Sequence, residues 1–152
     1  RVCCKWNVLT NRTKRKIAMS DISQVEVRNL FRHLQNNESE NFFARVRDDV
    51  QWTVKGTHPL AGHYRSKQDF LAATFSRLNL ILQEGVVLKV EHIFTANNTA
   101  VVEMKSLSTA KNGKPFNNTY CWVVEFDSEK NIAVVRAYLD SALVQQVVDE
   151  NE

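Results

Sequence analysis

The sequence predicts an α+β fold in which helices cover one face of a curved antiparallel sheet. Apolar residues at helical spacing dominate the first half of the chain, and alternating apolar and polar residues dominate the second half. An Asn112-Gly113 pair between two alternating stretches is the residue choice of a tight hairpin turn. A run of hairpin-connected strands after several helices is typical of this class.

Length and composition indicate one domain with one core. The chain has 152 residues, of which 43% are hydrophobic and 24% are charged, and both values are ordinary for a globular protein. No apolar run approaches the roughly 20 residues that a membrane-spanning helix needs. We therefore expect no membrane partner.

The net charge of +3 arises from residues 1–18, which hold six basic and no acidic side chains. Without them, 14 basic residues remain against 17 acidic ones, so the composition predicts no nucleic-acid-binding face. Residues 1–18 show no helical or strand period. We expect a disordered basic extension there, a natural start at Met19 and a domain over residues 19–152; a basic docking arm is the alternative.

The cysteines predict neither a disulfide framework nor a metal site. Cys3 and Cys4 are adjacent and Cys121 lies within a predicted strand, and the chain has no Cys-x-x-Cys or His-x-x-x-His spacing. Reduced thiols indicate a cytoplasmic protein.

Two helices and a strand are expected first. A helix capped by Ser20 or Asp21 buries the stripe Val27, Leu30, Phe31 and Leu34 and ends at Asn36-Asn37. A short helix with Phe42, Phe43 and Val46 inward follows. The next strand places on one face Val50, Trp52 and Val54.

A Gly- and Pro-containing loop over residues 56–65 precedes the next helix, which Ser66 opens and Gly85 ends. Its buried stripe is Leu71, Thr74, Phe75, Leu78 and Leu82. Strands are then expected over residues 86–96, 99–110, 116–127 and 131–139, with a closing helix over 141–148.

The last two strands carry faces that change from apolar to aromatic and polar. On the first of these strands, we expect one face to hold Asn118, Tyr120, Trp122, Val124 and Phe126. On the second strand, we expect one face to hold Ile132, Val134, Arg136, Tyr138 and Asp140. A packed floor, aromatic walls and a few polar groups are what a ligand pocket needs. These faces therefore predict a small-molecule site.

Three segments resemble the nuclear-transport-factor-2-like superfamily, and within it the polyketide-cyclase and SnoaL-like branch, which is related to ketosteroid isomerase. They are DDVQWTVKGTHPLAGHY, NGKPFNNTYCWVVEFD and IAVVRAYLDSALV, and the resemblance covers Ser20 to the last residue. It implies a cone-shaped fold, a ligand pocket inside the cone and a homodimer formed through the sheet. It also implies proton transfer by carboxylates without metal or cofactor.

The resemblance places a catalytic carboxylate at Asp140, because this residue matches the acid that ends the last strand in SnoaL-like cyclases. Burial in an aromatic cavity would raise its pKa and suit it to proton transfer. The alternative is an N-cap, because Asp140 directly precedes a helix; Ser141 could cap instead.

Other side chains are assigned to the same site. His58 and Tyr138 are candidates to relay a proton or polarise an oxygen, and Arg136 to bind a ligand oxygen or to form an ion pair on the sheet. Candidates for the pocket wall are Trp52, Tyr120 and Trp122.

These residues favour a cofactor-independent isomerase, cyclase or dehydratase that acts on a small apolar carbonyl metabolite. A ligand-binding or dimerising module without turnover is the alternative, and a protein-interaction adaptor is a third. Epoxide hydrolysis is disfavoured, because the segment Glu103-Met104-Lys105-Ser106 lacks the Arg-x-Asp pair of limonene epoxide hydrolase.

Overall fold

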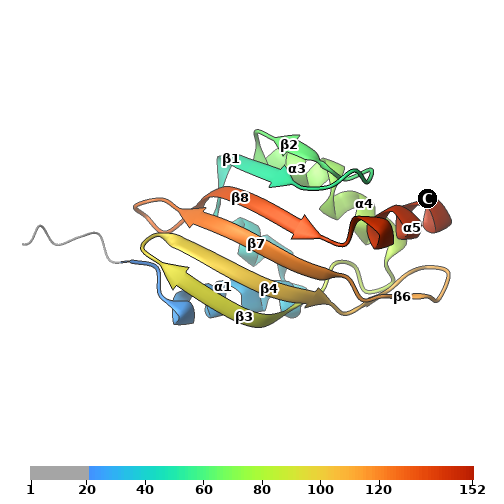
Figure 1. Ribbon diagram of the computed structural model, residues 1–152, viewed down its shortest axis with the longest axis horizontal. Helices are drawn as coiled ribbons and strands as arrows, with labels where there is room; N and C mark the ends of the chain where they lie inside the picture. Colours follow the sequence, from blue (N-terminus) through green and yellow to red (C-terminus); the bar gives the residue numbers. More distant parts are fainter. Residues whose placement is uncertain (1–20) are drawn as a thin grey trace, which may run out of the picture.

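The central element is a six-stranded sheet with the strand order β2-β1-β8-β7-β4-β3. The computed structural model describes residues 21–152, so the expectations for residues 1–18, Met19 and Ser20 lie outside the described range. The strands of the sheet are β1 (Val46–Val54), β2 (Gly62–Tyr64), β3 (Leu88–Ala96), β4 (Thr99–Ser106), β7 (Thr119–Phe126) and β8 (Ile132–Leu139). The helices lie behind this sheet and at one end of it (Figure 1).

The sheet is mixed rather than purely antiparallel. β3, β4, β7 and β8 form the expected antiparallel meander, and β1 joins its edge parallel to β8. β2 folds back on β1 within the segment that the sequence assigned to a loop. The α+β class is confirmed; the parallel pair arises because β1 and β8 are far apart in the chain and no hairpin fixes their direction.

Helix α1 (Gln24–Gln35) begins at Ser23, not at the expected Ser20 or Asp21. The Ser23 hydroxyl accepts the Glu26 backbone N–H and the Glu26 carboxylate accepts the Ser23 N–H, which is a complete capping box. The predicted apolar stripe faces inward, with Val27, Phe31 and Leu34 fully buried.

An aromatic cluster joins the helices to the sheet. Phe31 of α1 packs edge-on against Phe42 of α2 (Ser39–Phe43) at 5.0 Å and against Trp122 of β7 at 5.9 Å between ring centroids. Edge-to-face pairs add about 0.5–1.5 kcal/mol each beyond the burial of their area. These contacts fix α1 and α2 on the inner face of the sheet.

The expected helix over residues 66–85 is interrupted. α3 (Lys67–Ala73) ends and α4 (Phe75–Ile81) begins at Thr74, whose φ of −124° and ψ of −79° are not helical. The Thr74 hydroxyl donates to the Phe70 carbonyl at 2.7 Å, so a side chain satisfies an acceptor at the break.

The turn expected at Asn112-Gly113 is confirmed. It joins β5 (Ser108–Thr109) to β6 (Pro115–Phe116), and Gly113 has a φ of 84°. The closing helix α5 (Ser141–Asn151) docks on this hairpin through a Lys114–Glu150 ion pair of 2.8 Å. This end of the molecule lies opposite the start of α1 (Figure 1).

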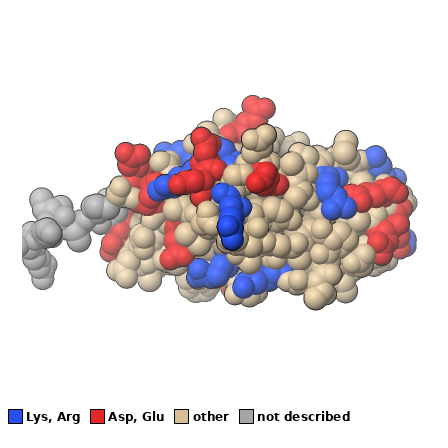
Figure 2. Space-filling view, turned by 90° about the horizontal axis from the view of Figure 1, so that it is seen from above, with Lys and Arg blue, Asp and Glu red and all other residues tan. Residues whose placement is uncertain are grey.

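On the face seen in Figure 2, basic and acidic side chains are interspersed and neither sign forms a continuous stripe. Among residues 21–152, no helix is long and apolar enough to cross a membrane.

Candidate functional site

A small cavity lies inside the cone between the sheet and a roof formed by the loop after β1 and by α3, α4 and α5. Its volume is about 40 Å³. The sheet contributes Trp52, Val54, Tyr120, Trp122, Ala137 and Leu139, and the roof contributes His58, Leu60, Phe70, Thr74, Phe75, Leu78 and Val144. The cavity is thus walled by aromatic and aliphatic groups, with a few polar groups among them.

The inward face predicted for β7 is confirmed. Tyr120 and Trp122 are both buried, and both line the cavity. Trp52 of β1 stacks on Phe70 of α3 with ring centroids 3.8 Å apart, and it meets Trp122 edge-on at 5.1 Å. Strand and roof are therefore held together by the same rings that line the cavity.

Of the residues predicted to point inward from β8, only the first, Ile132, is buried. Glu125 of β7 pairs with Val134, but the next residue of β7 pairs with Ile132, so Ala133 is an extra residue in a β-bulge. A bulge shifts the alternation of faces by one residue. As a result Ile132 and Val135 are both fully buried, which strict alternation forbids.

The bulge places Arg136 and Tyr138 on the outer face of the sheet. Arg136 donates to the Glu125 carboxylate at 3.1 Å, which is the ion-pair alternative stated for it, and Tyr138 is 45% exposed. Ala137 and Leu139 line the cavity in their place. Neither Arg136 nor Tyr138 is among the cavity-lining residues, so the predicted positions of both are corrected.

Asp140 also lies outside the cavity. It is exposed, and its carboxylate accepts the backbone N–H groups of Ala142 at 3.1 Å and Leu143 at 3.2 Å as the N-cap of α5. The capping alternative therefore describes its geometry, and Ser141 is the first residue of the helix instead of its cap.

The position of Asp140 is fixed by a buried amide. The Asn118 side chain accepts the Asp140 backbone N–H at 3.0 Å and donates to the Asp140 carbonyl at 3.2 Å. Asn118 is fully buried. Asn118 directly precedes β7 and is buried, as the predicted inward face requires, but the sequence shows no sign of this clamp because the partner of Asn118 lies at the end of another strand.

His58 lines the cavity as a neutral imidazole. Its Nε2 lies 3.1 Å from the Lys55 carbonyl, which can only accept, so Nε2 carries the proton. Nδ1 then accepts the Leu60 N–H at 3.2 Å. Burial lowers the pKa of His58, against the opposing effect of the hydrogen bond to Lys55. His58 therefore braces the loop in this conformation, with both nitrogens engaged.

Three donors of the cavity wall stand out. The indole nitrogens of Trp52 and Trp122 are buried and have no hydrogen-bond partner among the described residues. Burial raises the pKa of the Tyr120 phenol far above its ordinary value, so its O–H stays protonated. An unpaired buried donor costs about 1–3 kcal/mol, so two of them beside one cavity call for an explanation.

The volume of the cavity limits what it holds in this conformation. Sites for drug-sized ligands usually measure about 300–1,000 Å³, whereas about 40 Å³ admits a few water molecules at most. A metabolite would therefore require displacement of the roof. The roof residues Leu60, Phe70 and Val144 were not among the predicted site residues. They are apolar residues of a loop and of helices, and their sequence pattern indicates burial in the core but not contact with a cavity.

Among residues 21–152, no group of three or more His, Cys, Asp or Glu side chains is arranged to hold a metal ion. Cys121 is half-buried, and burial followed by the nearby Glu103 carboxylate raises the pKa of its thiol. Cys121 alternates with Tyr120 and Trp122 along β7 and does not line the cavity.

No protein-family model matches the chain. Two curated fungal proteins do: "Dimerizing cyclase phiC" of Fungal sp. (strain ATCC 74256), 28% identical over 134 residues, and "Dimerizing cyclase tstC" of Talaromyces stipitatus, 26% identical over 134 residues. Each alignment covers 86% of this chain and 59% of the relative, so the chain spans about three fifths of their length.

Solved structures confirm the fold. An NTF2-like protein from Burkholderia thailandensis superposes with a TM-score of 0.68 and 23% identity, covering 80% of this chain and 92% of that one. TerC co-crystallized with polyporic acid superposes with a TM-score of 0.64 and 13% identity, covering 81% of this chain and 95% of TerC. A protein of ketosteroid isomerase-like fold from Catenulispora acidiphila, in complex with trimethylamine, superposes with a TM-score of 0.63 and 10% identity. The superposition covers 81% of this chain and 91% of that one.

Proposed function

We propose that this chain, which has the nuclear-transport-factor-2-like fold and is distantly homologous to fungal dimerizing cyclases, binds a small, largely apolar carbonyl compound in the cone cavity and catalyses proton transfer on it. The observation that carries the proposal is that two of the residues lining the cavity, Trp52 and Trp122, have buried indole N–H groups without a hydrogen-bond partner among the described residues. A carbonyl oxygen of a ligand would accept from such donors and relieve their cost.

The chemistry follows from the same donors. When a proton leaves the carbon next to a carbonyl, negative charge develops on the oxygen. The Tyr120 O–H and the indole N–H groups of Trp52 and Trp122 are donors that would stabilise that charge in a site screened from water. If a carbon–carbon double bond is conjugated with the enolate, the proton can return to the far carbon of the dienolate, which is an isomerisation. If the enolate carbon instead attacks a second carbonyl carbon of the compound, that C=O π bond breaks and its oxygen takes the proton from the base, which is a cyclisation.

His58 is the proposed base. It is the only basic side chain among the residues that line the cavity, and its lowered pKa keeps it neutral and able to accept a proton at neutral pH. Its Nδ1 becomes available once the Leu60 N–H moves away. The same movement of the roof would enlarge the cavity, with the helix break at Thr74 as the point of flexure.

Acetophenone and α-methylstyrene, which differ mainly by a carbonyl oxygen against a CH₂ group, provide a matched test of binding. Acetophenone should move the indole proton signals of Trp52 and Trp122 downfield in NMR spectra, and α-methylstyrene should not. Ala137→Leu should abolish the effect by filling the cavity, whereas Ala133→Leu on the bulge should retain it. Equal responses to both compounds would contradict the role of the donors.

Catalysis is tested separately by exchange of the acetophenone methyl protons in deuterium oxide. The protein should accelerate exchange, and His58→Gln should lower the rate by roughly 100-fold or more, as expected for loss of a general base. Tyr120→Phe should lower it by a smaller factor with His58 intact. Binding without any accelerated exchange would favour the alternative, a ligand-binding module without turnover.

We also propose that two copies pair through the outer face of the sheet. Phe94, Val101 and Val123 lie side by side across β3, β4 and β7 on that face, and Phe94 is 56% exposed. The word "dimerizing" in the names of the two fungal relatives is no evidence for this pairing. Light scattering should give twice the chain mass for the native protein and the single chain mass for Val123→Lys. Thr119→Lys, at the end of the same face of β7, is the control and should keep the doubled mass.

A further inference from the structure

A hollow larger than the cone cavity lies outside the cone. It is an open groove of about 590 Å³ between α1, the segment after α2 and the β7–β8 turn. Its apolar floor includes Ile22, Leu30 and Phe126, and Ile22 and Phe126 are almost completely buried. This volume falls within the usual range of small-molecule sites, unlike that of the cone cavity. We call it the α1 groove.

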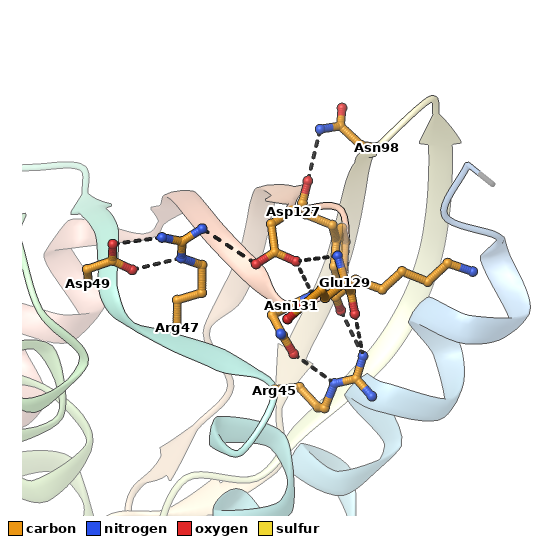
Figure 3. Close-up of polar contacts among 9 residues, drawn as sticks. Arg45, Arg47, Asp49, Asn98, Asp127, Glu129 and Asn131 are labelled. Carbon is orange, nitrogen blue, oxygen red and sulfur yellow. Dashed lines mark hydrogen bonds and ion pairs between the residues drawn. The ribbon is translucent and has the colours of Figure 1, made fainter. Parts of the chain in front are cut away.

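Arg45 lines the α1 groove and is held in a fixed orientation by the β7–β8 turn (Figure 3). Its Nε donates to the Asn131 side chain at 3.2 Å, and its Nη2 donates to the backbone carbonyls of Lys130 at 3.0 Å and Glu129 at 3.4 Å. The turn is itself braced by the Asp127 carboxylate, which accepts the N–H groups of Glu129 and Asn131. The guanidinium is therefore oriented before any ligand arrives.

The charge of Arg45 is not neutralised by a carboxylate among the described residues. All three of its acceptors are uncharged, and its Nη1 makes no hydrogen bond within residues 21–152. Its neighbour Arg47 differs, because it pairs with Asp49 at 2.7 Å and with Asp127 at 3.5 Å (Figure 3). The other basic side chains that line the groove have acidic partners, because Lys130 pairs with Glu26 and His33 contacts Glu38 at 2.7 Å. One unneutralised positive charge thus remains beside an apolar floor.

We propose that the α1 groove binds a small amphipathic carboxylate, with the carboxylate on Arg45 and the apolar part on Ile22, Leu30 and Phe126. Because Nε and Nη2 are already engaged, Nη1 supplies the free N–H donors, and one carboxylate oxygen would accept a charge-assisted hydrogen bond from it. The Glu26–Lys130 ion pair bounds the groove with no net charge, so it neither competes for the carboxylate nor repels it. This site is independent of the chemistry proposed for the cone.

Octanoate and octanamide are the probes, because they share the chain and differ in the charge of the head group. Calorimetric titration of the full chain at low salt should show tighter binding of octanoate, and added salt should weaken it. Arg45→Gln should weaken octanoate roughly tenfold or more, the effect of losing a charge-assisted hydrogen bond, and should leave octanamide unchanged. Arg47→Gln is the matched control and should bind both probes normally.

Arg45→Gln also loosens the turn, so a second variant keeps the test independent of folding. Ala44 lines the groove and is exposed, and Ala44→Trp should block both probes without touching the turn. The proposal is overturned if the two probes bind equally, if Ala44→Trp binds them normally, or if NMR shifts caused by octanoate fall on Trp52 and Trp122 instead of on Leu30 and Phe126.

Discussion

Replacing Asp140 by alanine separates its capping role from a catalytic one. The carboxylate accepts two backbone N–H groups, at 3.1 and 3.2 Å, at the start of α5. Loss of an N-cap side chain costs about 0.5–2 kcal/mol, and the exposure of Asp140 places the expected loss near the middle, at about 1 kcal/mol. For a domain of this size, that loss lowers the melting temperature by about 2–5 °C.

Asp140→Asn is the matched variant. Asparagine keeps an oxygen that can accept the same N–H groups and is as good an N-cap as aspartate, so its stability should lie within about 0.5 kcal/mol of the native protein. Urea unfolding at neutral pH measures both variants, and exchange of acetophenone protons measures the site. Both variants should retain the native exchange rate.

The opposite pattern would refute this reasoning. If Asp140→Asn keeps full stability and abolishes exchange, the carboxylate itself moves the proton, and the α5 cap must open during the reaction. If Asp140→Ala loses stability but keeps the native exchange rate, the role of Asp140 is to stabilise the fold.

Three further outcomes are expected from the buried contacts and the surface ion pair. Asn118→Ala should lower the free energy of unfolding by about 2–5 kcal/mol, because it leaves the Asp140 N–H and carbonyl unpaired; urea curves that match the native protein would contradict the clamp. Hydrogen bonds from Lys130 and Ser23 lower the pKa of Glu26 to about 2, so its contribution to stability is present above pH 4.5 and lost as the pH falls toward 2. Glu26→Gln should flatten the stability profile in that window, and parallel profiles would exclude the pair as its source. Phe31→Ala should cost about 3–5 kcal/mol in urea unfolding, because a fully buried ring leaves a void; a loss below about 1 kcal/mol would mean that the core collapses to fill it.

The bulge at Ala133 explains why the predicted site was half right. Residues of β7 alternate strictly from Tyr120 to Val124, so their inward face follows from the sequence. β8 has the same kind of alternation on paper, but the extra residue shifts Arg136 and Tyr138 to the outer face. Nothing local marks Ala133, because the bulge is defined by its pairing with Glu125 and Phe126 of another strand.

By itself, the sequence determined most of the helices and strands, though not β2 or the break between α3 and α4. It also determined where the Asn112-Gly113 turn falls and which side chains of α1, β1 and β7 point inward, because these depend on neighbours a few residues away. Only the tertiary structure decided that β1 runs parallel to β8, that Thr74 breaks a helix and that Asp140 caps one. It also decided that the cone cavity measures only about 40 Å³ while a groove of about 590 Å³ lies beside Arg45. The strand pairing and the two hollows depend on contacts between residues distant in the chain, which local pattern does not encode. The Asp140 cap is a local contact, but only the structure decided between it and the catalytic alternative.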